Sequence, residues 1–176
     1  GELRTLLSQA DRDIARLDAI AALLPNPDLF VAMYVRHEAV LSSQIEGTQA
    51  SLTDLFDEEA GFAVSNGDDV EEVTNYLRAF RHVQDTLRDP AGLPLSVRLL
   101  CETHRLLLDG VRGQNKQPGE LRRSQNWIGG TRPGNAAFVP PPPERVPDLL
   151  ADLERFIHAP LDGVLPPLVR IALVHV

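Results

Sequence analysis

Apolar residues recur every three or four positions along most of this chain, and that spacing is typical of amphipathic helices. The pattern predicts helices over residues 2–24, 28–47, 68–88, 96–108, 144–158 and 164–176, and a short helix that begins near Ser51. Pro25 and Pro27 end the first stretch, and polar loops at 61–67 and 113–119 separate later ones. We therefore expect an all-α fold.

Charged and capping residues support three of these helices. Residues 68–88 begin with acidic side chains and end with arginines, an order that complements the helix macrodipole. Ser51 can cap the short helix while Asp54 reaches back, a variant of the capping box in which Glu or Gln is more usual. Ser96 stands at the N-cap of the helix that Gly110 closes.

One segment, residues 125–143, departs from the helical pattern. Its sequence indicates two short extended arms around a glycine-rich turn, with the characteristic residues Trp127, Ile128, Gly129, Gly130, Phe138 and Val139. Four successive prolines at 140–143 stiffen the exit from the second arm. Taken alone, the segment predicts an ordinary surface β-hairpin.

The segment 42–48, with the sequence SSQIEGT, places a carboxylate at the end of a helix that is otherwise apolar. Glu46 in the last turn opposes the negative end of the helix macrodipole, at a cost of roughly 0.3–1 kcal/mol unless a cation compensates it. We therefore expect an external cationic partner for Glu46. The simpler alternatives are a solvated acid at Glu46, a solvent-facing serine at Ser42 on the same helical face, and a plain C-cap at Gly47.

Charge and composition exclude several classes of partner. The net charge of −8, with Lys116 as the only lysine, argues against a nucleic-acid platform and against an anionic membrane surface. No apolar run approaches the ~20 residues of a membrane span, and the N-terminus lacks the pattern of a signal peptide. Cys101 stands alone, so a reducing cytoplasm fits best, and the five scattered histidines predict no metal site.

Several segments, in order, resemble the Fic family, whose members typically transfer AMP from ATP to a hydroxyl side chain. The pattern Ser/Thr-x-x-x-Glu-Gly/Asn at residues 42–47 is similar to the inhibitory-helix motif of that family. The other similar segments are RHEAVL at 36–41, SLTDLF at 51–56, PGELR at 118–122, QNWIGG at 125–130 and FVPPPP at 138–143.

The resemblance implies a Fic-type helical bundle with a small β-hairpin flap. It divides the chain into an N-terminal helical arm at 1–27, a Fic N-terminal region with the inhibitory helix at 28–90, and the first part of the Fic catalytic core at 91–176. Residues 125–143 would be the flap that docks the target protein through extended backbone.

The catalytic signature of the family, His-Pro-Phe-x-Asp/Glu-Gly-Asn-Gly-Arg-x-x-Arg, does not occur in these 176 residues. The fold is thus expected to be truncated before the catalytic loop, His175 is not the catalytic histidine, and no catalytic residue is assigned in this chain. By resemblance, ATP and Mg²⁺ would be held through that signature, and the chain as printed should be inactive alone.

By resemblance, Glu46, Ser42 and Gly47 are the residues that gate ATP. Glu46 would pair with the last arginine of the signature, Ser42 would anchor the glutamate or the helix end, and Gly47 would let the chain turn away. The implied function is an autoinhibited protein adenylyltransferase whose target carries a Ser, Thr or Tyr hydroxyl.

Two other functions stay open. The chain could be a non-catalytic helical module that regulates a separate Fic chain, or an interaction domain with no link to nucleotides. A homodimer through the apolar stripe of residues 2–24 and docking of that stripe on its own domain are likewise both open.

Overall fold

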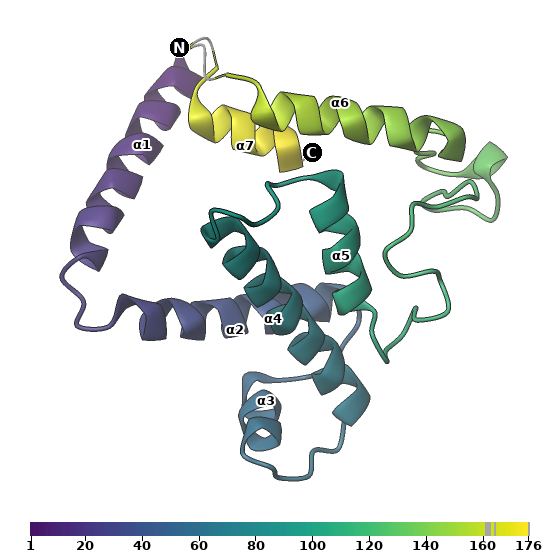
Figure 1. Cartoon of the computed structure of the whole chain (residues 1–176), viewed down its shortest axis with the longest axis horizontal. Coiled ribbons are helices and arrows are strands. Elements are labelled where there is room, and N and C mark those ends of the chain that lie inside the picture. The colour runs from purple at the N-terminus through teal and green to yellow at the C-terminus, as the bar shows by residue number, and fades with distance from the viewer. Residues whose placement is uncertain (161–162, 164, 176) are drawn as a thin grey trace. The chain divides into compact units, whose positions relative to one another are not determined.

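The computed structural model describes residues 1–160, 163 and 165–175, and helices joined by loops account for that part of the chain (Figure 1). The helices are α1 (Glu2–Ala21), α2 (Pro27–Ile45), α3 (Leu52–Glu59), α4 (Gly67–Arg88), α5 (Val97–Leu107), α6 (Val146–His158) and α7 (Pro167–His175). Two short 3₁₀ turns, η1 (Pro133–Asn135) and η2 (Pro143–Arg145), complete the set. The predicted all-α fold is confirmed.

The observed helices differ from the predicted ones mainly at their ends. The first helix stops at Ala21, three residues before the predicted end, and the second stops at Ile45 instead of residue 47. The helix expected from residue 144 begins at Val146, because the turn η2 occupies the residues before it. None of the helices that the structure describes has both the length and the apolar character that a bilayer span requires.

The described chain divides into two compact units, and the boundary falls within α2. One unit comprises Gly1–Glu38 with the described residues from Pro160 onward, and the other is Ala39–Ala159. The first unit contains α1, most of α2 and α7, and none of the described residues of α1 or α7 is buried. The buried residues of the structure therefore lie in the second unit.

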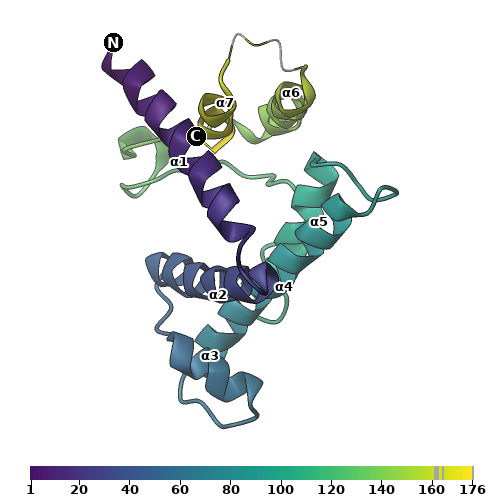
Figure 2. The ribbon, with the colours of Figure 1, turned by 90° about the vertical axis from the view of Figure 1, so that its left-hand side faces the viewer.

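The core of the second unit is built around α4, the longest helix. Helix α4 packs against α3 and α5 (Figures 1 and 2), and its apolar stripe supplies the buried residues Val70, Val73, Leu77 and Ala79. The neighbouring elements add Ala39, Val40, Leu55 and Leu99. Helix α6 contacts α5 through Glu154, whose carboxylate accepts a hydrogen bond from the first backbone N–H of α5, at Val97 (2.8 Å).

The predicted caps are present. The Ser51 hydroxyl accepts from the Asp54 N–H at 3.2 Å, and the Asp54 carboxylate accepts from the Ser51 N–H at 2.9 Å, so the capping box is complete despite the aspartate. The Ser96 hydroxyl accepts from the N–H of Leu99 at 3.3 Å. Gly110, two residues after α5's C-cap at Leu108, has φ +74°.

The predicted β-hairpin flap is wrong in its detail. No strand forms in the described residues, and 125–143 contain a single antiparallel bridge between Ile128 and Phe138. Gly129 and Gly130, at φ +69° and +67°, turn the chain directly after Ile128, and the prolines from 140 onward have no N–H for a ladder. Too few residues remain between the two to pair as strands.

Asn75 is a buried polar residue of α4 that ties this helix to the chain after α5. Its amide donates to the backbone carbonyls of Asp109 (2.7 Å) and Leu107 (3.5 Å), and its side-chain oxygen accepts from Arg78 at 2.7 Å. Only 2% of the surface of Asn75 is exposed, and both polar atoms of its side chain form hydrogen bonds that are shielded from water. The end of α5 is thereby fixed to the middle of α4.

Replacement of Asn75 by Ala should lower the free energy of unfolding by about 2 kcal/mol, because it removes the hydrogen bonds of a buried amide and leaves a cavity in their place. Urea denaturation followed by circular dichroism measures this. The exposed Asn115→Ala is the matched control and should stay within about 0.5 kcal/mol of wild type. Equal stabilities of the two variants would contradict the anchoring role.

The capping box also predicts a pH dependence. Hydrogen bonds from the Ser51 hydroxyl and backbone lower the pKa of Asp54 below its ordinary value of 3.8. A carboxyl with a lowered folded pKa stabilises the protein above its unfolded pKa, and that contribution is lost as pH falls through the folded value. Asp54→Asn should therefore lose less stability than wild type between about pH 5 and about pH 3. Thermal unfolding across this range, with Asp57→Asn as the control on the same helix, would decide it.

Candidate functional site

A surface cleft of about 610 Å³ lies in the second unit where the end of α2 meets α4 and the loop after α5. Its polar lining comes from Ser42, Ser43, Glu46, Glu72, Tyr76 and Arg112, and Leu107, Leu108 and Val111 supply apolar wall. Two of the three residues expected to gate ATP, Ser42 and Glu46, thus lie on one cleft. Gly47 lies in the turn beside it, outside the lining.

The end of α2 is a Schellman motif, and Glu46 is its C-cap residue. The N–H of Thr48 donates to the carbonyl of Ser43 at 3.2 Å, and the N–H of Gly47 donates to the carbonyl of Gln44 at 3.0 Å. Gly47 has φ +99°, the left-handed conformation that this motif needs after the C-cap. The backbone of Glu46 is thus fixed, and its exposed side chain starts from the rim of the cleft.

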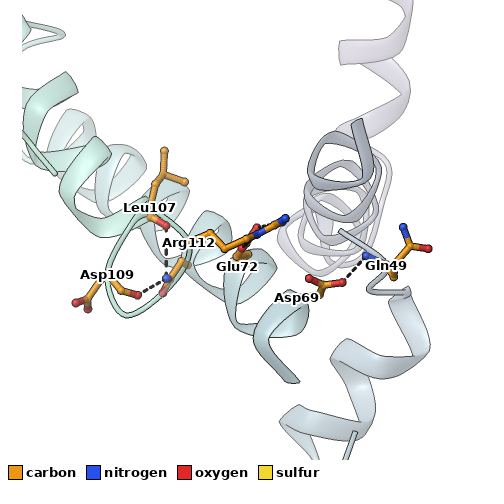
Figure 3. A network of polar contacts seen from close by, with 7 residues as sticks. Gln49, Asp69, Glu72, Leu107, Asp109 and Arg112 are labelled. Atoms are coloured by element: carbon orange, nitrogen blue, oxygen red, sulfur yellow. Dashed lines mark hydrogen bonds and ion pairs between the residues drawn. The ribbon is translucent and has the colours of Figure 1, made fainter. Parts of the chain in front are cut away.

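The chain after this turn is held against α4. The backbone N–H of Gln49 donates to the Asp69 carboxylate at 2.6 Å (Figure 3), and the Gln44 side chain donates to the carbonyl of Ala50 at 3.1 Å. Thr48 and Ala50 are buried, and the Thr48 hydroxyl has no hydrogen-bond partner within the described residues. One rim of the cleft is therefore anchored on both sides of Gly47.

The opposite rim carries an ion pair between Arg112 and Glu72. In Figure 3 the guanidinium of Arg112 and the carboxylate of Glu72 on α4 point toward one another, with two contacts of 2.5 and 2.8 Å. The hydrogen bonds to Glu72 raise the pKa of Arg112 above its ordinary value. Arg112 is 60% exposed and Glu72 only 18%, so the carboxylate is the fixed member of the pair. This bidentate geometry orients the guanidinium along the loop.

The electrostatics of the cleft are unbalanced. Glu46 and Glu72 contribute two carboxylates, and the guanidinium of Arg112 is already engaged by Glu72. The last turn of α2 holds no basic residue, and no ion pair of Glu46 is found in the part of the chain that the structure describes. A cation from elsewhere would therefore meet an accessible carboxylate at the negative end of a helix.

The described lining of the cleft carries more negative than positive charge. No group of three or more His, Cys, Asp or Glu residues with metal-binding geometry exists in the described part of the chain. The carboxylates of the lining outnumber its single guanidinium, so a polyanion would be repelled.

The flap residues of 125–143 form a separate feature of the second unit and do not line the cleft. Ile128 and Phe138 exchange backbone hydrogen bonds of 2.9 and 3.2 Å. The guanidinium of Arg122 donates to the carbonyls of Ser124 and Pro141, one on each arm, so the base of the flap is closed. Four apolar side chains are left 41–65% exposed, namely Trp127, Ile128, Phe138 and Val139.

A close contact accounts for the glycine at position 130. A Cβ at this residue would lie 2.4 Å from the backbone oxygen of Asn135, a distance that no side chain tolerates. The Asn135 amide oxygen accepts from the N–H groups of Thr131 (3.0 Å) and Arg132 (2.9 Å), which keeps the tip tight. The flap is therefore a compact tip that presents apolar side chains on short extended arms.

Sequence reasoning missed the residues on the far side of the cleft. Arg112, Glu72 and Tyr76 lie 30 or more positions from Ser42 in the chain, and no local pattern links them. The available signal was indirect, since the sequence shows only that Gly110 and Gly113 flank Arg112. In the structure both glycines have positive φ. Two such glycines around one arginine indicate a tight loop that holds the side chain in place.

Gly47→Ala should destabilise the second unit by about 1 kcal/mol, because a Cβ at φ +99° is strained even though it would meet nothing within 4 Å. Gly134→Ala is a clean control, since its Cβ also meets no atom within 4 Å and its φ is not positive. That variant should be neutral or slightly stabilising. Indistinguishable denaturation midpoints would show that the helix end has rearranged.

Comparison with known families places almost the whole chain in one group. The model of the Fic/DOC family N-terminal region matches residues 4–85, and the model of the Fic/DOC family matches residues 94–176. No curated protein matches the chain. The order of the two matches agrees with the order of the similar sequence segments, and this protein belongs to the Fic/DOC family.

Proposed function

We propose that this chain is the regulatory and target-docking part of an autoinhibited protein adenylyltransferase. Membership of the Fic/DOC family suggests AMP transfer in general terms. The observation that carries the proposal of autoinhibition is the position of Glu46, whose carboxylate lies at the rim of a cleft, on a fixed helix end, with no basic residue in the same helical turn. The arrangement suits capture of a cation from outside the described residues.

In the proposed gate, Glu46 binds an arginine of the family's catalytic signature and so denies that guanidinium to the nucleotide. An exposed carboxylate–arginine pair is worth only about 0–1 kcal/mol, but a partly buried, bidentate pair contributes more when desolvation is offset. Each ~1.4 kcal/mol changes the ratio of blocked to open states tenfold. Even a modest pair is therefore enough to set the basal activity.

Ser42 and Gly47 have supporting roles in this proposal. Ser42 lines the same cleft as Glu46 one turn earlier, where its hydroxyl can position the gate. Gly47 allows the chain to turn away directly after Glu46 without moving the carboxylate. Glu72 keeps Arg112 occupied, so that Glu46 is left to the external guanidinium.

The flap supplies the second half of the proposal. Its exposed apolar residues, Trp127, Ile128, Phe138 and Val139, offer a surface for a segment of the target that carries the Ser, Thr or Tyr hydroxyl. The bridge between Ile128 and Phe138 fixes the two arms relative to one another. The chemistry of transfer belongs to ATP and Mg²⁺ with the catalytic signature, and the single unpaired Cys101 is in keeping with a cytoplasmic setting.

The proposal is tested with radiolabelled ATP. Reading the coding sequence past the codon for Val176 shows whether the signature follows in the same polypeptide. If it does, that polypeptide is assayed for auto-modification, and Glu46→Gly should raise labelling by at least about tenfold, because the blocked state loses its ion pair. The neutral isostere Glu46→Gln should act in the same direction.

Glu58→Gln on α3 removes an equal charge from an exposed site away from the cleft and should leave labelling unchanged. Unchanged labelling in a folded Glu46→Gly variant would rule out the gate. If no signature follows Val176 and the 176-residue chain instead lowers labelling by a separate Fic protein, the alternative of a regulatory module acting in trans is correct.

A further inference from the structure

Helix α1 carries an apolar stripe along its length. None of its residues is buried, and Leu3 and Leu17 are 83% and 67% exposed. The stripe has the alternating spacing of four and three residues that defines a heptad repeat, through Leu3, Leu7, Ala10, Ile14, Leu17 and Ala21. A helix with three such repeats is suited to pair with another helix along its length.

We propose that the occupant of this stripe is α1 of a second copy of the chain, packed as an antiparallel two-helix coiled coil. In that arrangement Leu3 of one copy lies opposite Ala21 of the other, Leu7 opposite Leu17, and Ala10 opposite Ile14. Each alanine thus faces a large residue, so no layer consists of two small side chains. A packed helix interface requires large side chains to fill the space that small ones leave.

A parallel pairing of the same helices packs poorly. It would place Ala10 opposite Ala10 and Ala21 opposite Ala21, which leaves voids. Each Leu or Ile of the stripe would lie opposite the same large residue of the other copy. Of the two orientations, the antiparallel one pairs every alanine of the stripe with a large residue.

The charges that flank the stripe favour the same orientation. In the antiparallel pair, Arg4 of one copy lies beside Asp18 of the other, twice by symmetry, and on the opposite flank Leu6 lies beside Ile20. In the parallel pair, Asp13 of each copy would instead lie beside Asp18 of the other copy, so like charges would meet on both sides of the stripe. Within the described residues, neither Arg4 nor Asp18 takes part in an ion pair of its own chain.

The centre of the antiparallel pair carries its main unfavourable feature. Asp11 and Asp13 each approach their own symmetry mates near the two-fold axis, so like charges meet there. Neutralising Asp11 should therefore strengthen the dimer, whereas loss of a surface charge that faces no partner should not raise the affinity. This sign gives the model a second, independent prediction.

Sedimentation equilibrium of the 176-residue chain tests the proposal over roughly a hundredfold range of concentration, where a dimer gives a rising average mass. Arg4→Asp and Asp18→Arg should each weaken the dimer by about threefold to tenfold, and the double variant should restore wild-type affinity, because the pair is reversed. Asp11→Asn should strengthen it. Arg12→Asp, whose wild-type side chain bonds Ser8 on the outer face, is the matched control and should have no effect.

Disulfide cross-linking in a Cys101→Ser background tests the orientation. A Leu7→Cys chain mixed with a Leu17→Cys chain should give a mixed cross-linked dimer, whereas neither variant alone should cross-link, because its two cysteines lie about 15 Å apart along the axis. A monomer at every concentration, failure of the Arg4–Asp18 reversal to restore affinity, or cross-linking of each variant with itself would overturn the proposal. None of these measurements depends on nucleotide transfer, so they leave the proposed function untouched.

Discussion

Helix α4 holds the loop after α5 through a row of polar contacts, and the cleft exists because of that hold. Asn75 binds two backbone carbonyls at the end of α5, Arg78 pairs with Asp109 at 2.9 Å, and Glu72 binds Arg112. Of these residues only Asn75 is fully buried. The outer ion pairs therefore contribute little to stability and act mainly by fixing the position of the loop. The Asn75 contacts thus fix the backbone at the far wall of the cleft.

The same helix also fixes the near wall. Asp69, one turn before Glu72, binds the backbone N–H of Gln49 just after the turn that contains Gly47. Asp69, Glu72 and Asn75 follow one another at intervals of three residues, so they lie along one side of α4. One row of polar residues thus sets the spacing between the end of α2 and the loop that carries Arg112. Glu46 and Arg112 are therefore held on the same framework.

Local features of the sequence predicted local structure well. Periodicity located the seven α-helices that the described residues form, and the capping box at Ser51 and the cap at Ser96 formed as expected. The flap does not form a β-hairpin, because glycines turn the chain directly after Ile128 and the prolines that follow Val139 have no N–H to donate. The alternation of residues around Ile128 and Phe138 predicts strands but does not reveal this limit. The residues across the cleft from Glu46 were not predictable, since Glu72 and Arg112 come from distant segments that only the packing of α4 brings together.

The Schellman motif at the end of α2 bears on the speed of the proposed gate. Because the backbone around Glu46 is fixed by hydrogen bonds and by the buried Thr48, the carboxylate leaves a cation by rotating about its own side-chain bonds. Exposed side chains change rotamer within picoseconds to nanoseconds, far faster than a helix moves or an enzyme turns over. Inhibition that depends on this side-chain rotation would be a rapid equilibrium. Any ligand that competes for the same arginine would shift that equilibrium, and the helix would not have to unfold.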